Sequence, residues 1–374
     1  MRLAPLCFLA FGASPLAAAQ DGDDPLAFGG EGRSLRFEPF VQVDVLAAED
    51  TDGLPAQSTD LNLARLYVTG EAGDLSGTLA YEFQDAGGWR YAYLSYAATE
   101  RVSVTVGQQD EPFSLADLSG SRAAIFSDAA AATALIPGDN AGVSITYAGD
   151  AFTAAGGIFG GDIDTGLGDE GTAVSGRITF NPTGKPRDGA TVLHLGAAAA
   201  HRSGADFRAG FATGAGAGLL PRTLLGIGSF DDVERLDRAN LELALRRGPA
   251  WVQAEATGAR IDRGGRTFDA SAAYLVAGYL LTGESRPYGG GTFGQIAPAR
   301  PVPEGGPGAW AVALRADAAD FEAEGESVRA SAALNWHLTR ALRASLDASY
   351  SETTDRDLGE REASILFLRL QYAH

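Results

Sequence analysis

The chain has 374 residues, a formal net charge of −19 and one cysteine, and 45% of its residues are hydrophobic. This acidity makes the chain a poor nucleic-acid binder, because an anionic surface repels the phosphate backbone. The one cysteine, Cys7, lies near the N-terminus, so the remaining chain offers no disulfide, no thiol nucleophile and no thiolate metal site.

The N-terminus has the pattern of a secretory signal peptide. Arg2 is followed by an apolar run over 3–16 and then by three alanines before Gln20. The run is too short for a transmembrane helix, and prolines interrupt it. We therefore predict a cleaved signal peptide over 1–19, and hence export to the bacterial outer membrane.

The next segment, 20–36, is polar, acidic and rich in glycine. We expect it to be a flexible N-terminal segment that precedes one folded domain over 37–374. No later segment offers about 18 uninterrupted apolar residues, so no spanning helix is expected. Segments of about ten residues with alternating apolar and polar side chains follow instead, which is typical of a transmembrane β-barrel.

The sequence predicts sixteen such strands. In 75–85 the apolar Leu75, Leu79 and Phe83 oppose the polar Thr78 and Glu82. An even number of strands places both ends of a bacterial barrel on one side of the membrane. The predicted strands are 37–48, 61–70, 75–85, 89–97, 101–107, 141–148, 152–160, 173–180, 190–201, 239–247, 250–260, 267–281, 309–318, 327–338, 341–351 and 361–373.

The last strand shows most clearly which face meets lipid. Leu366, Leu368 and Leu370 fall on one face, and Arg369 and Gln371 fall on the other. Successive side chains of a strand point to opposite faces, so the leucines are expected to meet lipid and the polar residues the lumen. The predicted fold is an all-β transmembrane antiparallel β-barrel of about 16 strands.

Three connections are too long for simple loops, since structureless loops beyond about 12–15 residues are uncommon. A sixteen-stranded barrel leaves an aqueous channel, so we expect these segments to fold into the lumen and to narrow it. They are 108–140, 202–238 and 282–308.

The other long connections are rich in aspartate and glutamate and are placed on the outer side. Two interpretations of these acids stay open, a solvated rim and a site for divalent cations that bridge to lipopolysaccharide. These connections are 49–60, 161–172, 319–326 and 352–360.

Several short motifs, in order, resemble the phosphate-selective porin O and P family over nearly the whole chain after the signal peptide. The resemblance implies a sixteen-stranded outer-membrane barrel, usually a homotrimer, with arginines along a pore that binds phosphate-like anions. The matching motifs are Arg65-Leu66 before Gly70, 106–115 (VGQQDEPFSL), Ser121-Arg122, Pro137-Gly138, Gly142-Val143, 156–161 (GGIFGG), 194–196 (HLG), 281–288 (LTGESRPY), 305–310 (GGPGAW) and 368–371 (LRLQ).

The chain departs from this family pattern at two places. Asn62 and Leu63 stand where the family often has a pair of arginines, and Asp110 stands where it has a loop lysine. An anion filter needs a dense ring of positive charge. The expected function is therefore passive diffusion of small hydrophilic solutes, phosphate or other small anions among them, with a non-selective or cation-preferring porin as the alternative.

Four arginines are candidates for an anion-binding track along the pore. Arg65 and Arg101 lie in strands whose other face is apolar, and an arginine facing lipid at mid-bilayer costs about 2–4 kcal/mol. Both are thus expected to face the lumen, where they either contact anions or pair with acids such as Glu82. Arg122 lies in the constriction loop, and Arg286 is placed to reach the pore from the periplasmic side or to pair with Glu284.

Three acids of the same loop region, Asp110, Glu111 and Asp117, have two open interpretations. They either make the constriction tolerant of cations or form a hydrogen-bonded latch that fixes the loop to the wall. Separately, the aromatic residues of 89–97, among them Tyr91 and Tyr93, are expected in an interfacial girdle or in packing between protomers.

No catalytic residue, cofactor or metal site is expected. His194 and His201 are seven residues apart on one strand, so they face opposite sides, and no zinc motif is present. Two other classes of protein remain as alternatives. An outer-membrane barrel enzyme such as a lipase would depend on His201, and a structural barrel would have a plugged lumen.

Overall fold

The computed structural model describes residues 26–30, 32–50, 56–84, 87–164, 170–184, 189–213, 225–322, 324–356 and 359–374. The predicted signal peptide, 1–19, lies outside the described residues. Within them, no helix has both the length and the apolar character needed to cross a membrane.

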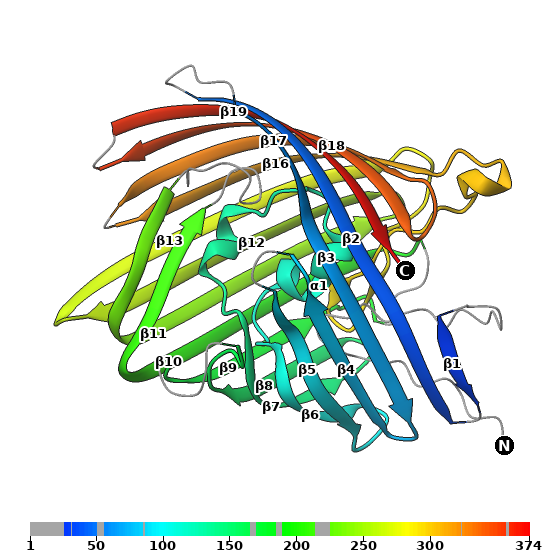
Figure 1. Ribbon diagram of the computed structural model, residues 1–374, viewed down its shortest axis with the longest axis horizontal. Helices are drawn as coiled ribbons and strands as arrows, with labels where there is room; N and C mark the ends of the chain where they lie inside the picture. Colours follow the sequence, from blue (N-terminus) through cyan, green and yellow to red (C-terminus); the bar gives the residue numbers. More distant parts are fainter. Residues whose placement is uncertain are drawn as a thin grey trace.

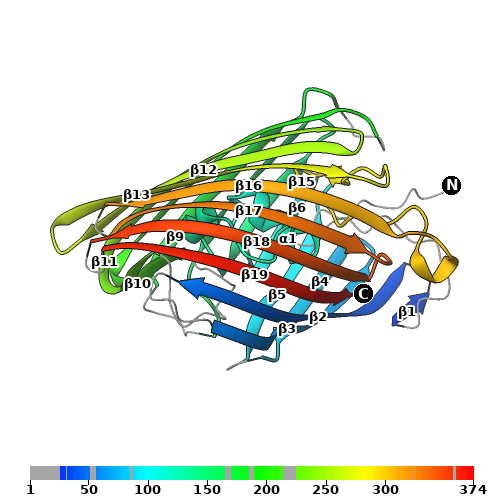
Figure 2. The ribbon, with the colours of Figure 1, turned by 90° about the horizontal axis from the view of Figure 1, so that it is seen from above.

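Sixteen strands form one closed antiparallel barrel (Figures 1 and 2), as the sequence predicts. Each strand pairs with its neighbours in the chain, and β19 pairs with β2 to close the sheet, with Ala373 opposite Phe40. The barrel strands are β2 (Arg33–Asp50), β3 (Ala56–Ala72), β4 (Leu75–Glu82), β5 (Gly88–Ala97), β6 (Val102–Asp110), β7 (Asp139–Ala148), β8 (Phe152–Phe159), β9 (Thr172–Phe180), β10 (Val192–Thr213), β11 (Leu225–Arg247), β12 (Ala250–Arg263), β13 (Arg266–Leu280), β16 (Ala309–Phe321), β17 (Gly325–His337), β18 (Leu342–Asp355) and β19 (Gly359–Ala373).

The N-terminal end of the barrel differs from the predicted one. The barrel begins at Arg33, and a short strand, β1 (Ala27–Gly30), pairs with β2 over 33–36. The described part of 20–36 is thus mostly strand, because β2 extends past the end of β19 and leaves an edge that β1 covers.

The expectation that 202–238 folds into the lumen as a loop is wrong. Strands β10 and β11 continue through most of this segment, paired as far as Thr213 and Leu225. The pairing is irregular between Ser203 and Phe211 but continues beyond it, and Phe207 and Phe211 are both buried, so the segment lengthens the wall.

The two faces of the wall are distributed as the alternating pattern predicts. On β19, Leu368 is 48% exposed on the outside, whereas Arg369 is 4% exposed and points inward. The outer face of the strands carries the apolar side chains that meet lipid, and the inner face carries the charged and polar ones.

A β-bulge in β5 changes this alternation. Ala80 pairs with Tyr91 and Tyr81 pairs with Trp89, so Arg90 is an extra residue in the ladder. The bulge shifts the phase, and Tyr91 and Tyr93 are buried on the lumen side rather than in an outer girdle. The prediction of a girdle is therefore wrong for these two tyrosines.

One of the three long connections enters the barrel, and so does part of a second, whose turn over 302–304 projects beyond the rim (Figures 1 and 2). The first, 111–138, contains α1 (Leu115–Ala123) and η1 (Ala131–Leu135), and Figure 1 shows α1 enclosed by the strands. The second, 281–308, contains β14 (Tyr288–Gly289), β15 (Thr292–Phe293) and η2 (Val302–Glu304), and its β15 packs against α1. We call these two segments the constriction loop and the terminal-side segment, since the latter lies at the rim that carries both chain ends.

Candidate permeation path

A cavity of about 610 Å³ lies inside the barrel, beside the constriction loop. Its lining comes from the inner faces of β2 to β7, from the constriction loop and from part of the terminal-side segment, and Gln253, Tyr274, Val276 and Arg315 add single positions of β12, β13 and β16. We call the inner faces of β2 to β7 the open wall. We call the inner faces of β10 to β13 and β16 to β19 the sealed wall, because most of these strands pack against the constriction loop or hydrogen-bond to it.

The four arginines predicted from the sequence all line this one cavity. Arg65 forms an ion pair with Glu82 and donates a hydrogen bond of 2.6 Å to the Tyr67 hydroxyl. Arg122 comes from α1 and lies 3.2 Å from Glu38, with its guanidinium 4.9 Å from the centre of the Tyr67 ring. The two arginines thus approach one tyrosine from the wall and from the loop.

Arg101 lies at the mouth of the cavity rather than on its inner wall. It precedes β6, in the turn at the terminal rim, and its side chain is 57% exposed. Its nearest acid is Asp150, at 3.8 Å. The expectation that Arg101 belongs to a strand is wrong, because the strand begins one residue later.

Arg286 reaches the interior from the terminal-side segment. Its guanidinium lies 4.3 Å from the centre of the Phe293 ring and donates a 3.2 Å hydrogen bond to Gln253. Burial lowers the pKa of Arg286 to about 10, so the side chain is still a cation at neutral pH. Among the described residues no acid forms an ion pair with Arg286, so the expected alternative pairing with Glu284 is not formed.

Of the two interpretations of the loop acids, the latch applies to Asp110 and Glu111. Neither residue lines the cavity. Asp110 accepts hydrogen bonds from Arg90 at 2.7 Å and from the Tyr91 hydroxyl at 2.6 Å. Glu111 accepts from Asn140 and Arg202, both at 2.7 Å. These contacts fix both ends of the constriction loop to the wall.

Asp117 is the acid of the three that faces the cavity. Its side chain is 21% exposed and lies 4.0 Å from Arg90. Burial raises the pKa of Asp117 to about 7, the nearby Asp110 adds to this rise, and Arg90 opposes it. Near neutral pH, Asp117 therefore exchanges between a neutral and an anionic form.

The cavity lining is more positive than the chain as a whole. Eight arginines and six carboxylates line it, although the whole chain carries a net charge of −19. The arginines are Arg36, Arg65, Arg90, Arg101, Arg122, Arg286, Arg315 and Arg340, and the acids are Glu38, Glu71, Asp74, Glu100, Asp117 and Asp128.

The sealed wall holds the second half of the constriction loop through buried charges. Arg329 pairs with Asp317 at 2.8 Å and with Asp128 of the loop, and it donates to the carbonyl of Ala129. Asp347 accepts a 2.6 Å hydrogen bond from the backbone of Ser127. The apolar η1 packs beside them, so this side of the lumen is filled.

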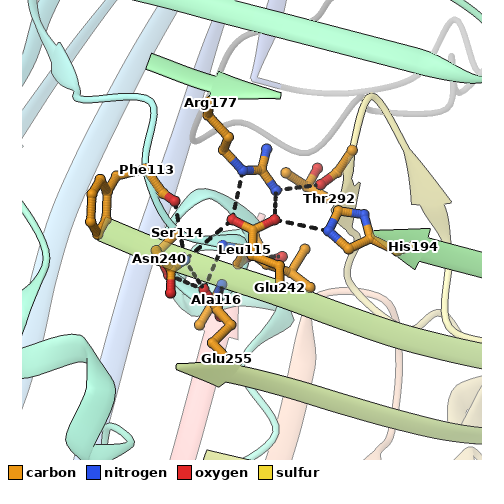
Figure 3. Close-up of polar contacts among 12 residues, drawn as sticks. Phe113, Ser114, Leu115, Ala116, Arg177, His194, Asn240, Glu242, Glu255 and Thr292 are labelled. Carbon is orange, nitrogen blue, oxygen red and sulfur yellow. Dashed lines mark hydrogen bonds and ion pairs between the residues drawn. The ribbon is translucent and has the colours of Figure 1, made fainter. Parts of the chain in front are cut away.

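Two further carboxylates hold the segments that enter the lumen (Figure 3). Glu242 is bound by both Nε and Nη2 of Arg177 at 2.8 Å and by His194 Nε2 at 2.8 Å. Arg177 also donates to the carbonyl of Gly291, and His194 Nδ1 lies 2.7 Å from the Tyr288 hydroxyl. This cluster fastens the terminal-side segment.

Glu255 fastens the constriction loop from the neighbouring strand. Its carboxylate accepts hydrogen bonds from the Ser114 hydroxyl at 2.8 Å and from the backbone nitrogens of Leu115 at 2.9 Å and Ala116 at 2.8 Å. An anion at a helix N-terminus is favourable, because the first N–H groups of a helix have no partner within it. Figure 3 shows this carboxylate below the first turn of α1.

The sequence alone does not single out these anchors or Arg90. Each of Arg177, Glu242, Glu255 and Arg329 is a charged residue that alternates with apolar ones in a predicted strand. The period of two gives the signal that they face the lumen. Their partners, which lie 65 residues away for the Arg177–Glu242 pair, follow from strand pairing and cannot be read from spacing. Arg90 has no such signal, because the bulge breaks the period.

The comparison with known families gives one match across nearly the whole chain. The model of the family "Phosphate-selective porin O and P" matches residues 36–374. A protein from Caulobacter vibrioides described as uncharacterized is 29% identical over 322 residues, which is 78% of this chain and 62% of that protein. The chain thus spans a little under two thirds of this relative's length.

Among solved structures, similar barrels share the fold at low sequence identity. OmpT, an outer membrane protein of Vibrio cholerae, has a TM-score of 0.60 at 11% identity, covering 93% of this chain and 99% of its own. A trimer form of OmpT has a TM-score of 0.57 at 12% identity, with coverage of 92% and 100%. An anion-selective porin from Comamonas acidovorans has a TM-score of 0.58 at 15% identity, with coverage of 91% and 100%.

Proposed function

The chain belongs to the phosphate-selective porin O and P family, and we propose that it is an outer-membrane porin through which small hydrophilic anions diffuse along the open wall. The main support is the charge of the cavity, where arginines outnumber acids in an otherwise acidic protein. A narrow passage lined by arginines raises the local concentration of anions and lowers that of cations.

The proposed track consists of Arg65, Arg122 and Arg286, and Arg101 lies at its mouth. Arg286 contributes the strongest field, since no described acid pairs with it. Arg65 and Arg122 contribute less, because Glu82 and Glu38 neutralise part of their charge. Phosphate is the proposed example of a permeating solute, since the planar guanidinium of arginine suits its oxygens.

A weakly selective or cation-preferring pore is the second candidate, and Asp117 is the observation that favours it. This acid faces the same cavity from α1, opposite the arginines. In its anionic form it offsets the nearest cation of the track. The two candidates differ in the sign and size of the reversal potential in a salt gradient.

The experiment is a single-channel recording in planar bilayers with the purified full-length barrel. In a KCl gradient, anion preference is expected, and added phosphate is expected to reduce the chloride current by competing for the arginines. Arg286→Gln is expected to weaken both effects, and Arg340→Gln, at the edge of the same cavity, serves as the matched control. A clear cation preference of the unmodified protein would contradict the anion proposal.

The proposed partners are those of an outer-membrane porin. The rim that carries the termini has the tight turns of the periplasmic side, with Gly73-Asp74 and Gly248-Pro249 as examples. At the opposite rim Asp269, Asp320 and Glu322 are exposed, which supports contact with lipopolysaccharide through divalent cations. Loss of copurified lipopolysaccharide on chelation would support this contact, and its retention would contradict it.

We also propose a homotrimer, cleavage of the predicted signal peptide, and no enzymatic activity. The trimer form of a similar barrel supports the first, and native mass spectrometry tests it. N-terminal sequencing of the exported protein tests cleavage before Gln20.

His201 is exposed and lies 2.6 Å from Asp237, as in a surface ion pair. Hydrolysis of a lipid ester that is lost in His201→Ala would contradict the last proposal.

A further inference from the structure

Two glutamates face each other across neighbouring strands in the lumen. Glu242 of β11 is paired directly with Glu255 of β12, and both side chains are buried. Like charges directly opposite each other in a sheet destabilise it, and a buried charge needs partners. The two carboxylates obtain these partners in different ways.

Glu242 is compensated by one cation, Arg177, and by a hydrogen bond with His194. Glu255 has five hydrogen-bond partners in the described part of the chain, and all five are neutral donors. Asn240 and Tyr274 belong to the wall, at 2.9 and 2.5 Å, and the other three donors belong to the constriction loop. The loop itself therefore compensates the charge of Glu255.

We propose that Glu255 is a positioning residue that sets the selectivity of the pore by holding the acid-bearing half of α1 in the passage. The proposal rests on the proposed porin function. Ser114 caps the helix, so the carboxylate of Glu255 binds the same turn that carries Asp117. The place of Asp117 beside Arg90 depends on this contact.

The arginine-bearing half of α1 is positioned separately. Gly120 has a φ of 74° and interrupts the helix between Asp117 and Arg122. A positive φ of this kind suits glycine and makes the two halves separate units. Beyond Arg122 the loop is held by the sealed wall, through the Ser127–Asp347 hydrogen bond at 2.6 Å. Glu255 thus fixes the position of the half of α1 that carries Asp117, and the sealed wall fixes the position of the half that carries Arg122.

Release of the first turn of α1 would change the pore in two ways. The turn would leave the passage and widen it, which weakens selectivity, and it would carry Asp117 away from the anion path. Glu255 would also lose three of its five hydrogen-bond donors. The docked loop is favoured because it satisfies a carboxylate that is costly to leave without donors.

The experiment compares Glu255→Gln with Glu100→Gln in single-channel recordings of the full-length protein. Each variant removes one carboxylate charge from the lumen, but Glu100 lies at the mouth of the cavity and, among the described residues, forms no hydrogen bond with α1. We expect E255Q to switch between at least two conductance levels. The upper level should exceed that of the unmodified channel, and its reversal potential should differ from that of the lower level. E100Q is expected to keep one steady level, with a small shift toward anions from the lost charge.

A milder variant keeps the proposal testable if E255Q does not fold. Ser114→Ala removes one of the three loop donors and leaves the carboxylate in place, so the same switching is expected at a lower frequency. One steady level in both E255Q and S114A, or equal switching in E100Q, would overturn the proposal. A cation-preferring unmodified channel would contradict the proposed function only, because E255Q and E100Q would still differ in switching if the proposal holds.

Discussion

The two walls of the lumen use the same residue types for different purposes. On the sealed wall, arginines and acids are buried together and bind the constriction loop, as in the cluster of Arg329, Asp317 and Asp128. On the side of the open wall, Arg65 of β3 and Arg122 of α1 each pair with one acid and still line a cavity. Counting arginines in the lumen therefore does not identify the pore.

The difference lies in what each charge has as partners. A buried pair gains Coulomb energy but loses hydration, so it stabilises only when its remaining donors are satisfied. On the sealed wall those donors reach backbone carbonyls of the loop, as Arg329 does with Ala129. Arg122, in contrast, faces the cavity, and its side chain stays 19% exposed. The sealed wall is thus expected to determine stability, and the open wall is expected to determine permeation.

The largest expected effect is on stability, at the seam where β19 of the sealed wall meets β2 of the open wall. Asp44 of β2 accepts two hydrogen bonds from Arg369 of β19, at 2.7 and 2.6 Å, where the first and last barrel strands meet. Asp44→Asn leaves a buried arginine without its counter-charge, which costs about 3–5 kcal/mol. Equilibrium unfolding in urea with the barrel in lipid vesicles measures this loss.

The matched control is an ion pair of the open wall. Arg36 lies 2.6 Å from Glu71, and its side chain is 30% exposed. Arg36→Gln is expected to cost less than about 1 kcal/mol, because exposed pairs gain little. Equal losses in the two variants would contradict the division of roles between the walls.

The next effect concerns permeation and involves the open wall. Arg122→Gln removes a cation from the cavity, and a unit charge about 5 Å from an ion in water contributes roughly 0.8 kcal/mol, or about fourfold in local anion concentration. The chloride-to-potassium permeability ratio should fall by about this factor. Arg343→Gln, on the sealed wall, is expected to lower stability and to change the ratio less than Arg122→Gln does. If Arg343→Gln changed the permeability ratio more than Arg122→Gln does, the result would contradict the assignment of permeation to the open wall.

A smaller effect should appear on changing pH. With its pKa raised to about 7 by burial, Asp117 is about 90% ionised at pH 8 and about 10% at pH 6. Acidification therefore removes a negative charge from the cavity, so anion preference rises as pH falls through 7. Reversal potentials at pH 8 and 6 measure the change. In Asp117→Asn the preference should stay at its acidic value, and an unchanged pH dependence in this variant would exclude Asp117 as the cause.

The smallest effect is expected at the mouth of the cavity. Arg101 is exposed, so salt screens its field, and the Debye length falls from about 10 Å at 0.1 M to about 3 Å at 1 M. Arg101→Gln should lower conductance slightly at 0.1 M KCl and leave it unchanged at 1 M. A persistent loss at 1 M would place Arg101 in the narrow part of the path.

The barrel was predictable because lipid and water on opposite sides of one wall impose a period of two, which is visible in β19 from Ile365 to Tyr372. Three of the four predicted arginines, Arg65, Arg122 and Arg286, stand in the motifs that resemble the family, whereas Arg101 stands in none of them. The sequence left open whether Asp110 and Glu111 form a latch, since their partners Tyr91 and Arg202 come from other strands. Those contacts depend on how the strands are placed in the barrel and on the bulge at Arg90.

The most direct test of the account is the chemical accessibility of the two walls in the conducting channel. The only cysteine of the sequence, Cys7, lies in the predicted signal peptide, so single cysteines can be introduced at Ser95, which lines the cavity, and at Ser345, which is buried on the sealed wall. A charged thiol reagent should block current through Ser95→Cys and leave Ser345→Cys conducting. Block at Ser345→Cys with an unaffected Ser95→Cys would contradict the assignment of the path to the open wall.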